Sequence, residues 1–200
     1  MQAPGTTLKA RFVTVQLTLL SIAVALILEN LLSLMLGLNE RTLVQLLQAV
    51  DVSVAAISMW VGFAYGIAST NKPPHLMDFL VHFALLFALC TAVYFIGNGN
   101  LLGYFLANAA GTGSACTSLF MDHRLARRVG QSGPVGTLAL LGIITLWELG
   151  SAALAAGDWL NEHYVVAVLV VPILLQCTAA LRSIRFWQQH LRDDPAPAAE

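Results

Sequence analysis

Charged residues are scarce in this chain. They make up 10% of its 200 residues, whereas the residues AVILMFWYC make up 58%. A soluble globular domain has about a quarter charged residues, so this composition excludes a disordered chain, a fibrous repeat and a typical soluble enzyme. The three cysteines, Cys90, Cys116 and Cys177, stand alone in apolar stretches and form no CxxC pair, which argues against a thiol metal site or a disulfide framework. The composition is typical of a helical membrane protein with several spans.

Several chemistry-bearing motifs are also missing. The Gly- and Ala-rich stretch 109–115 has no phosphate-binding lysine and lies inside an apolar segment, which excludes a nucleotide loop. A haem carrier needs several histidines facing into the membrane, and a protease built on Ser114 needs a histidine base. His82 is the only histidine well inside an apolar segment. Nothing supports a nucleic-acid surface, so we expect no cofactor, no metal and no nucleic-acid partner, and enzymatic activity is not favoured.

Six apolar segments are each long enough to cross a bilayer core, which takes about 20 helical residues. They cover residues 12–38, 42–69, 76–96, 101–121, 135–156 and 164–187. The sequence therefore predicts an all-α integral membrane protein with six transmembrane helices arranged as three hairpins. A short N-terminal segment, 1–11, precedes this domain at 12–187, and the tail 188–200 is predicted to be disordered.

Lysine and arginine fall on one side of this six-span arrangement. That side would hold Lys9, Arg11, Lys72, Arg124, Arg127, Arg128, Arg182, Arg185 and Arg192, whereas the other side would hold only Arg41. Because cytoplasmic loops are enriched in Lys and Arg, both termini are expected in the cytoplasm. The first segment is too long for a signal-peptide core and shows no clear cleavage site, so we expect a retained helix. The expected location is the cell membrane, and a bacterial inner membrane is favoured.

Three carboxylates lie at a similar depth inside the spans. Glu29, Asp51 and Glu148 are each about ten residues from an outer loop, which at 1.5 Å per residue places them roughly 15 Å below the outer helix ends. Asn108 and Gln176 fall near the same level. A carboxylate at the bilayer centre costs about 2.5–3.5 kcal/mol, so such residues are functional candidates. We expect all three to point into protein rather than lipid.

Small and hydroxylated residues line one face of several spans at three- and four-residue steps. One such stripe reads Thr14, Thr18, Ser21, Ala25, Glu29 and Ser33, and another reads Asp51, Ala55, Ser58, Gly62 and Gly66. Two interpretations remain open. The stripes could line a hydrated path with carboxylates at its centre. They could instead be close-packing faces, because small residues let membrane helices approach one another.

Asp78 and His82 form a possible secondary site. They stand four residues apart on one helix face, where they could simply pair or could form a proton relay. Asp78 lies in the first turn of its span, where a carboxylate favours the helix N-terminus.

In size and number of predicted spans, the chain resembles bacterial six-helix potassium channels related to lysosomal ones. The similar features are Glu29, late in the first span, and the stretch from Ser53 to Trp60 in the second. The Phe-Ser-Asp signature of that family is missing, since the first span begins Arg11-Phe12-Val13-Thr14. We infer no membership and carry over no functional residue.

The leading hypothesis is passage of a small cation or a proton, by a channel or an ion-coupled transporter. Glu29, Asp51 and Glu148 would form the charged layer, and Asn108 and Gln176 would act as neutral ligands. The alternative is a non-catalytic accessory or assembly subunit of a larger membrane complex. Expected partners are membrane lipid, the cation or proton, and a second copy or a partner membrane subunit.

Overall fold

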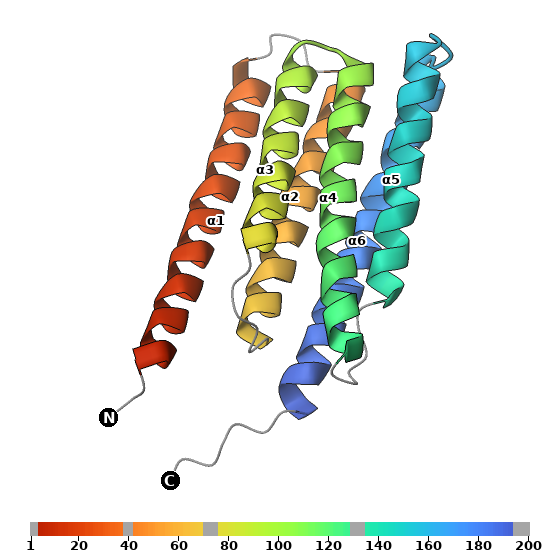
Figure 1. Cartoon of the computed structure of the whole chain (residues 1–200). Helices are drawn as coiled ribbons and strands as arrows, with labels where there is room; N and C mark the ends of the chain where they lie inside the picture. The colour runs from red at the N-terminus through yellow and green to blue at the C-terminus, as the bar shows by residue number, and fades with distance from the viewer. Residues whose placement is uncertain (1–3, 38–41, 70–75, 129–134, 194–200) are drawn as a thin grey trace.

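The computed structural model describes residues 4–37, 42–69, 76–128 and 135–193, and this part of the chain is all helical (Figure 1). The six helices are α1 (Pro4–Gly37), α2 (Leu43–Ser69), α3 (Leu76–Gly97), α4 (Leu101–Arg128), α5 (Val135–Ala156) and α6 (Glu162–Asp193). The outer loop with Arg41, the loop with Lys72 and residues 194–200 of the predicted tail lie outside the described residues. Each apolar segment predicted from the sequence corresponds to one helix.

Three helices extend beyond their predicted apolar segments. α1 begins at Pro4, α4 continues to Arg128 and α6 continues to Asp193. Hydropathy marks only the apolar part of a helix, whereas an existing helix gains one further hydrogen bond for each residue that extends it. Residues 188–193, predicted as the start of a disordered tail, are therefore helical.

Side-chain caps mark where several helices begin. Thr42 and Gln45 form a reciprocal capping box at the start of α2, with the Gln45 N–H bound to Thr42 Oγ1 at 3.2 Å. Asn100 accepts from the Gly103 N–H at 2.8 Å and caps α4. The turn before it places Gly99 at a φ of 63°, in the left-handed region that favours glycine. The predicted tight turn between α3 and α4 is thus explained.

Five of the six helices are long and apolar enough to cross a membrane, as a multi-pass membrane protein requires. The exception is α4, although it lies alongside the others (Figure 1). Its Tyr104, Asn108 and Thr112 side chains are buried, with an exposed fraction of 0% for Tyr104, whereas Thr117 and Arg124 near its other end are exposed. A helix that is covered by its neighbours needs less apolar surface than one that faces lipid, which accounts for the polar composition of α4.

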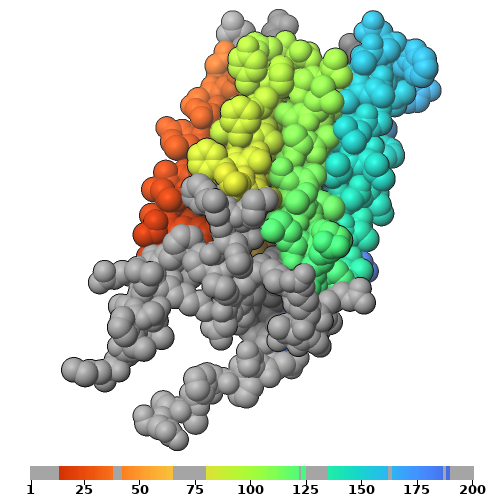
Figure 2. Space-filling model, in the orientation of Figure 1, coloured from red at the N-terminus to blue at the C-terminus, as the bar shows by residue number. Residues whose placement is uncertain are grey.

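The helices form a ring of five with a sixth outside it. Around the ring α2 packs on α6, α6 on α5, α5 on α4, α4 on α3 and α3 on α2. Within the described residues α1 packs on α2 and α3, and it lies at the edge of the bundle (Figures 1 and 2). The predicted hairpin partners do pack together, but the α2–α6 and α4–α5 contacts join the hairpins into one bundle.

Small residues stand where helices of the ring approach closely. A Cβ added at Gly111 of α4 would lie 3.4 Å from Leu85 and 3.5 Å from Ala88, both on α3. A Cβ added at Gly62 of α2 would lie 3.8 Å from the Ser183 hydroxyl of α6. The close-packing interpretation is therefore confirmed at these positions.

The stripe of small and hydroxylated residues on α1 is not buried in the bundle. Thr14, Thr18, Ser21, Ala25, Glu29 and Ser33 are all exposed on α1. The buried face of α1 is instead aliphatic and consists of Leu20, Val24, Ile27 and Leu31. The expectation that Glu29 points into the protein is wrong for this chain, because α1 presents its larger apolar side chains to α2 and α3.

Candidate functional site

Two buried carboxyl groups lie inside the ring. Asp51 belongs to α2 and Glu148 to α5, and both side chains have exposed fractions of 0%. The two groups are close enough to interact electrostatically. Because α6 packs on both α2 and α5, it holds in place the two helices that carry the carboxyls.

The ring helix α4 supplies two hydrogen-bond donors to Asp51. The Tyr104 hydroxyl donates to Asp51 Oδ2 at 2.6 Å, and the Asn108 amide donates to the same oxygen at 2.8 Å. Tyr104 and Asn108 are four residues apart, so they lie on one face of α4. The two donors fix the orientation of the Asp51 side chain.

Several buried oxygens of the predicted site residues have no hydrogen-bond partner among the described residues. Among the described residues, four buried oxygens of three side chains lack a hydrogen bond: Asp51 Oδ1, both Glu148 oxygens and Gln176 Oε1. All four are acceptors. Buried polar atoms are normally satisfied, and an unsatisfied one costs about 1–3 kcal/mol. The carboxyl oxygens among these four are therefore available as acceptors.

Three of the predicted site residues come together here, namely Asp51, Asn108 and Glu148. Gln176 is buried on α6 but lies about 12 Å of helix beyond Val168, the residue bonded to Trp147 beside Glu148. Asp51, Glu148, Asn108 and Gln176 are all at least nine-tenths buried. Glu29 is not among them, because it is exposed on the peripheral helix α1. The structure thus brings together the carboxyls of α2 and α5 and leaves the third apart.

Of the possible secondary site formed by Asp78 and His82, only the His82 side chain is described. Asp78 lies on α3, but its side chain is outside the described part of the molecule. His82 is partly buried, and its ring packs edge-on against Phe63 of α2, with the ring centroids 3.8 Å apart. His82 thus joins α3 to α2 through a packing contact. Among the described residues, no group of three or more His, Cys, Asp or Glu side chains could hold a metal ion.

Tyr104 is a site residue that sequence reasoning missed. The sequence places it in line with Asn108, but its hydroxyl was not assigned to the carboxylate layer. Gln48, three residues before Asp51 and 2% exposed, is a second polar residue near the layer. The available signal was the spacing: a polar residue three or four positions from a site residue shares its helix face.

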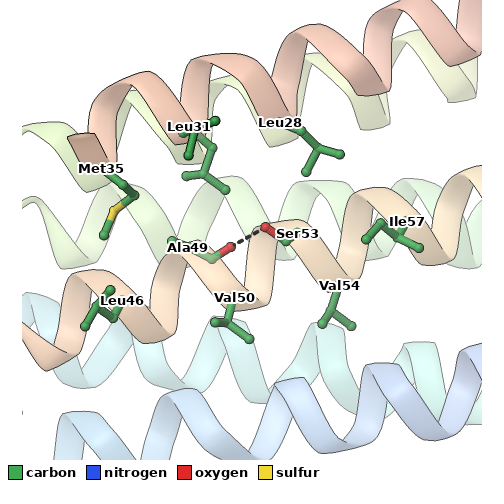
Figure 3. A pocket seen from close by; sticks show the side chains of 10 residues that line it. Leu28, Leu31, Met35, Leu46, Ala49, Val50, Ser53, Val54 and Ile57 are labelled. Carbon is green, nitrogen blue, oxygen red and sulfur yellow. Dashed lines mark hydrogen bonds between the residues drawn. The ribbon is translucent and has the colours of Figure 1, made fainter. Parts of the chain in front are cut away.

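An apolar cavity of about 440 Å³ lies elsewhere, between α1 and α2 (Figure 3). Leu28, Leu31 and Met35 of α1 face Leu46 and Ser53 of α2 across it. The Ser53 hydroxyl donates to the Ala49 carbonyl of its own helix at 2.8 Å, so it offers the cavity little polarity. This cavity is separate from the carboxyl layer.

No protein-family model matches the chain, and comparisons with curated proteins and with solved structures find no match either. Function must therefore be argued from the site itself.

Proposed function

We propose that this protein is an ion-coupled membrane transporter that binds a small cation or a proton at Asp51 and Glu148. The observation that carries the proposal is that three buried oxygens of Asp51 and Glu148 have no hydrogen-bond partner among the described residues. A bound proton or cation would satisfy acceptors that the described side chains leave unpaired. Asn108 orients the site.

Charge supports the same conclusion. Two ionised carboxylates in a low-dielectric interior repel each other and each loses its hydration. Neither Glu148 oxygen has a hydrogen-bond partner, cationic or neutral, among the described residues. The pair is therefore more stable when it has taken up a positive charge, which is the property required of a coupling-ion site.

Burial favours a carrier over an open channel. Asp51 and Glu148 are fully enclosed by the bundle, so an ion could reach them only when helices move apart. Opening a central site to one side at a time is the behaviour of an alternating-access carrier. We propose that the arrangement described here is the occluded state.

The proposed orientation in the membrane has both termini in the cytoplasm. The Pro4 end of α1 and the Asp193 end of α6 lie at the same end of the bundle (Figure 1). Nine of the ten Lys and Arg residues belong to the first part of α1, the last parts of α4 and α6, or the loop with Lys72, all of which are assigned to that end. The positive-inside rule then favours this side as cytoplasmic, and we propose a bacterial inner membrane as the location.

The test is flux through the purified protein in liposomes under an imposed pH gradient. Glu148→Gln and Asp51→Asn keep side-chain size but cannot ionise. Each is expected to lower the initial rate at least about tenfold, equivalent to about 1.4 kcal/mol. Asp158→Asn, an exposed carboxylate at the end of α5, is the matched control and should retain wild-type flux. Unchanged pH-dependent flux in Glu148→Gln would contradict the proposal.

A second candidate is a non-catalytic subunit of a larger membrane complex. The observation that favours it is Glu29, which is exposed on α1 within the apolar stretch Thr14–Gly37. A carboxylate facing lipid costs about 2.5–3.5 kcal/mol near the bilayer centre, and a covering partner chain would relieve that cost. This candidate predicts a co-purifying membrane protein that Glu29→Leu releases, and no flux by the chain alone.

A further inference from the structure

Trp147 stands immediately before Glu148 on α5 and is bound to α6. Its indole N–H donates to the backbone carbonyl of Val168 at 3.0 Å. Val168 is four residues before Pro172, which lies inside α6 and is fully buried. Because proline has no N–H, the Val168 carbonyl lacks its usual donor within the helix. The indole supplies the donor that Pro172 removes.

This hydrogen bond fixes the position of α5 along α6. It links the residue beside Glu148 to the turn of α6 that precedes Gln176, and α6 also packs on α2. A shift of α5 along α6 would break the bond and leave a carbonyl without a donor. The position of α5 relative to α2, and hence of Glu148 relative to Asp51, is therefore set partly through α6.

We propose that Trp147 is a positioning residue for Glu148: its bond to the carbonyl freed by Pro172 fixes α5 on α6 and holds Glu148 opposite Asp51. The inference rests on the proposed role of this carboxyl pair in binding an ion. The ionisable groups that act electrostatically on the Glu148 site are Asp51 from α2 and Tyr104 from α4. α6 carries the neutral Gln176, which is buried about two helical turns beyond Val168.

The experiment is a four-way comparison in the full-length protein. Trp147→Phe removes the indole N–H and keeps an aromatic ring. Pro172→Ala restores a backbone N–H four residues after Val168, so the double variant no longer needs the indole. Trp60→Phe is the control, because Trp60 also donates an indole bond, to Ser21 at 2.9 Å, between α2 and the peripheral α1.

The primary readout is the infrared absorption of the protonated Glu148 carboxyl as a function of pH, assigned by its loss in Glu148→Gln. Trp147→Phe is expected to lower the apparent proton affinity of Glu148 about threefold or more, since movement away from Asp51 weakens the repulsion that favours proton binding. The double variant should return to within about twofold of Pro172→Ala alone. Trp60→Phe should titrate like the wild type.

Two results would overturn the proposal: a Trp147→Phe titration that matches the wild type, or a shift that persists in full when Pro172→Ala is added. If Trp147→Phe does not fold, the indole N–H magnetic resonance signal of Trp147 is compared between wild type and Pro172→Ala, and an unchanged signal overturns it. Neither readout needs transport. Absent flux with the expected titrations would thus reject the proposed function and retain the positioning role.

Discussion

The two oxygens of Asp51 have different surroundings. Oδ2 accepts from both Tyr104 and Asn108, whereas Oδ1 has no partner among the described residues. The two hydrogen bonds from α4 hold Oδ2 in place, and Oδ1 remains available as an acceptor. One side chain thus combines a fixed orientation with an available acceptor, and Tyr104 is the residue that most directly maintains this state.

Removing the Tyr104 hydroxyl should destabilise the protein. Tyr104→Phe leaves Asp51 with one donor in place of two, and a buried group that loses a partner costs about 1–3 kcal/mol. The loss is measured as the change in free energy of unfolding in detergent. Tyr94→Phe is the control, because Tyr94 is 66% exposed on α3. Equal stability of the two variants would contradict the assigned hydrogen bond.

Replacing Glu148 should stabilise the protein, whereas removing the Tyr104 hydroxyl should destabilise it. Both of its oxygens are buried without a partner among the described residues, so its removal exposes no other group. Glu148→Leu is therefore expected to raise the free energy of unfolding by about 1–3 kcal/mol while it abolishes flux. Denaturation and liposome flux measured on the same preparation check both halves. A marked loss of stability would mean that Glu148 has a structural partner.

At the scale of whole elements, one glycine of α4 lies tightly against a side chain of α3. A Cβ added at Gly103 would come within 2.5 Å of the Phe95 ring, whereas one added at Gly142 on α5 meets nothing within 4 Å. Gly103→Ala should therefore lower the free energy of unfolding by about 1–3 kcal/mol through overpacking. Gly142→Ala should be neutral or stabilise by up to about 1 kcal/mol through helix propensity. Thermal unfolding of the two single variants distinguishes these outcomes.

Helix existence was predictable because it depends on local composition. Long apolar runs identified all six helices, and Asp51, Asn108 and Glu148 could be placed near one depth from residue counts alone. Helix pairing was not predictable in the same way. α1 carries both a hydroxylated stripe and an aliphatic stripe, and nothing local decides which of the two meets α2. Glu29 was misplaced for this reason.

The composition of α4 reflects its place in the bundle. Its polar residues made it the least membrane-like of the six helices by hydropathy, yet they include the two donors to Asp51. A sequence window reports the average character of a helix and not which face is covered. Tyr104 was missed because its role depends on α2, which is 53 residues away along the chain.

For the molecule as a whole, the even number of helices predicts that the two termini share a side. A tag placed at either terminus should be inaccessible from outside sealed cells and become accessible when they are permeabilised. The measurement is labelling by a membrane-impermeant reagent, with a tag inserted beside Trp159, which is 74% exposed at the other end of the bundle, as the opposite control. An externally labelled C-terminal tag would contradict the six-span orientation.

The long separation between Asp51 and its partners also governs how the protein is made. Helices emerge from the ribosome in order, at about 5–20 residues per second. Tyr104 therefore follows Asp51 by roughly 3–10 s at that rate, and Glu148 and α6 follow later still. During this interval α2 must hold a carboxyl that has no α4 donor, at a cost of about 2.5–3.5 kcal/mol near the bilayer centre. Asp51 therefore costs more in the half-synthesised chain than in the finished bundle, where Tyr104 and Asn108 donate hydrogen bonds to it.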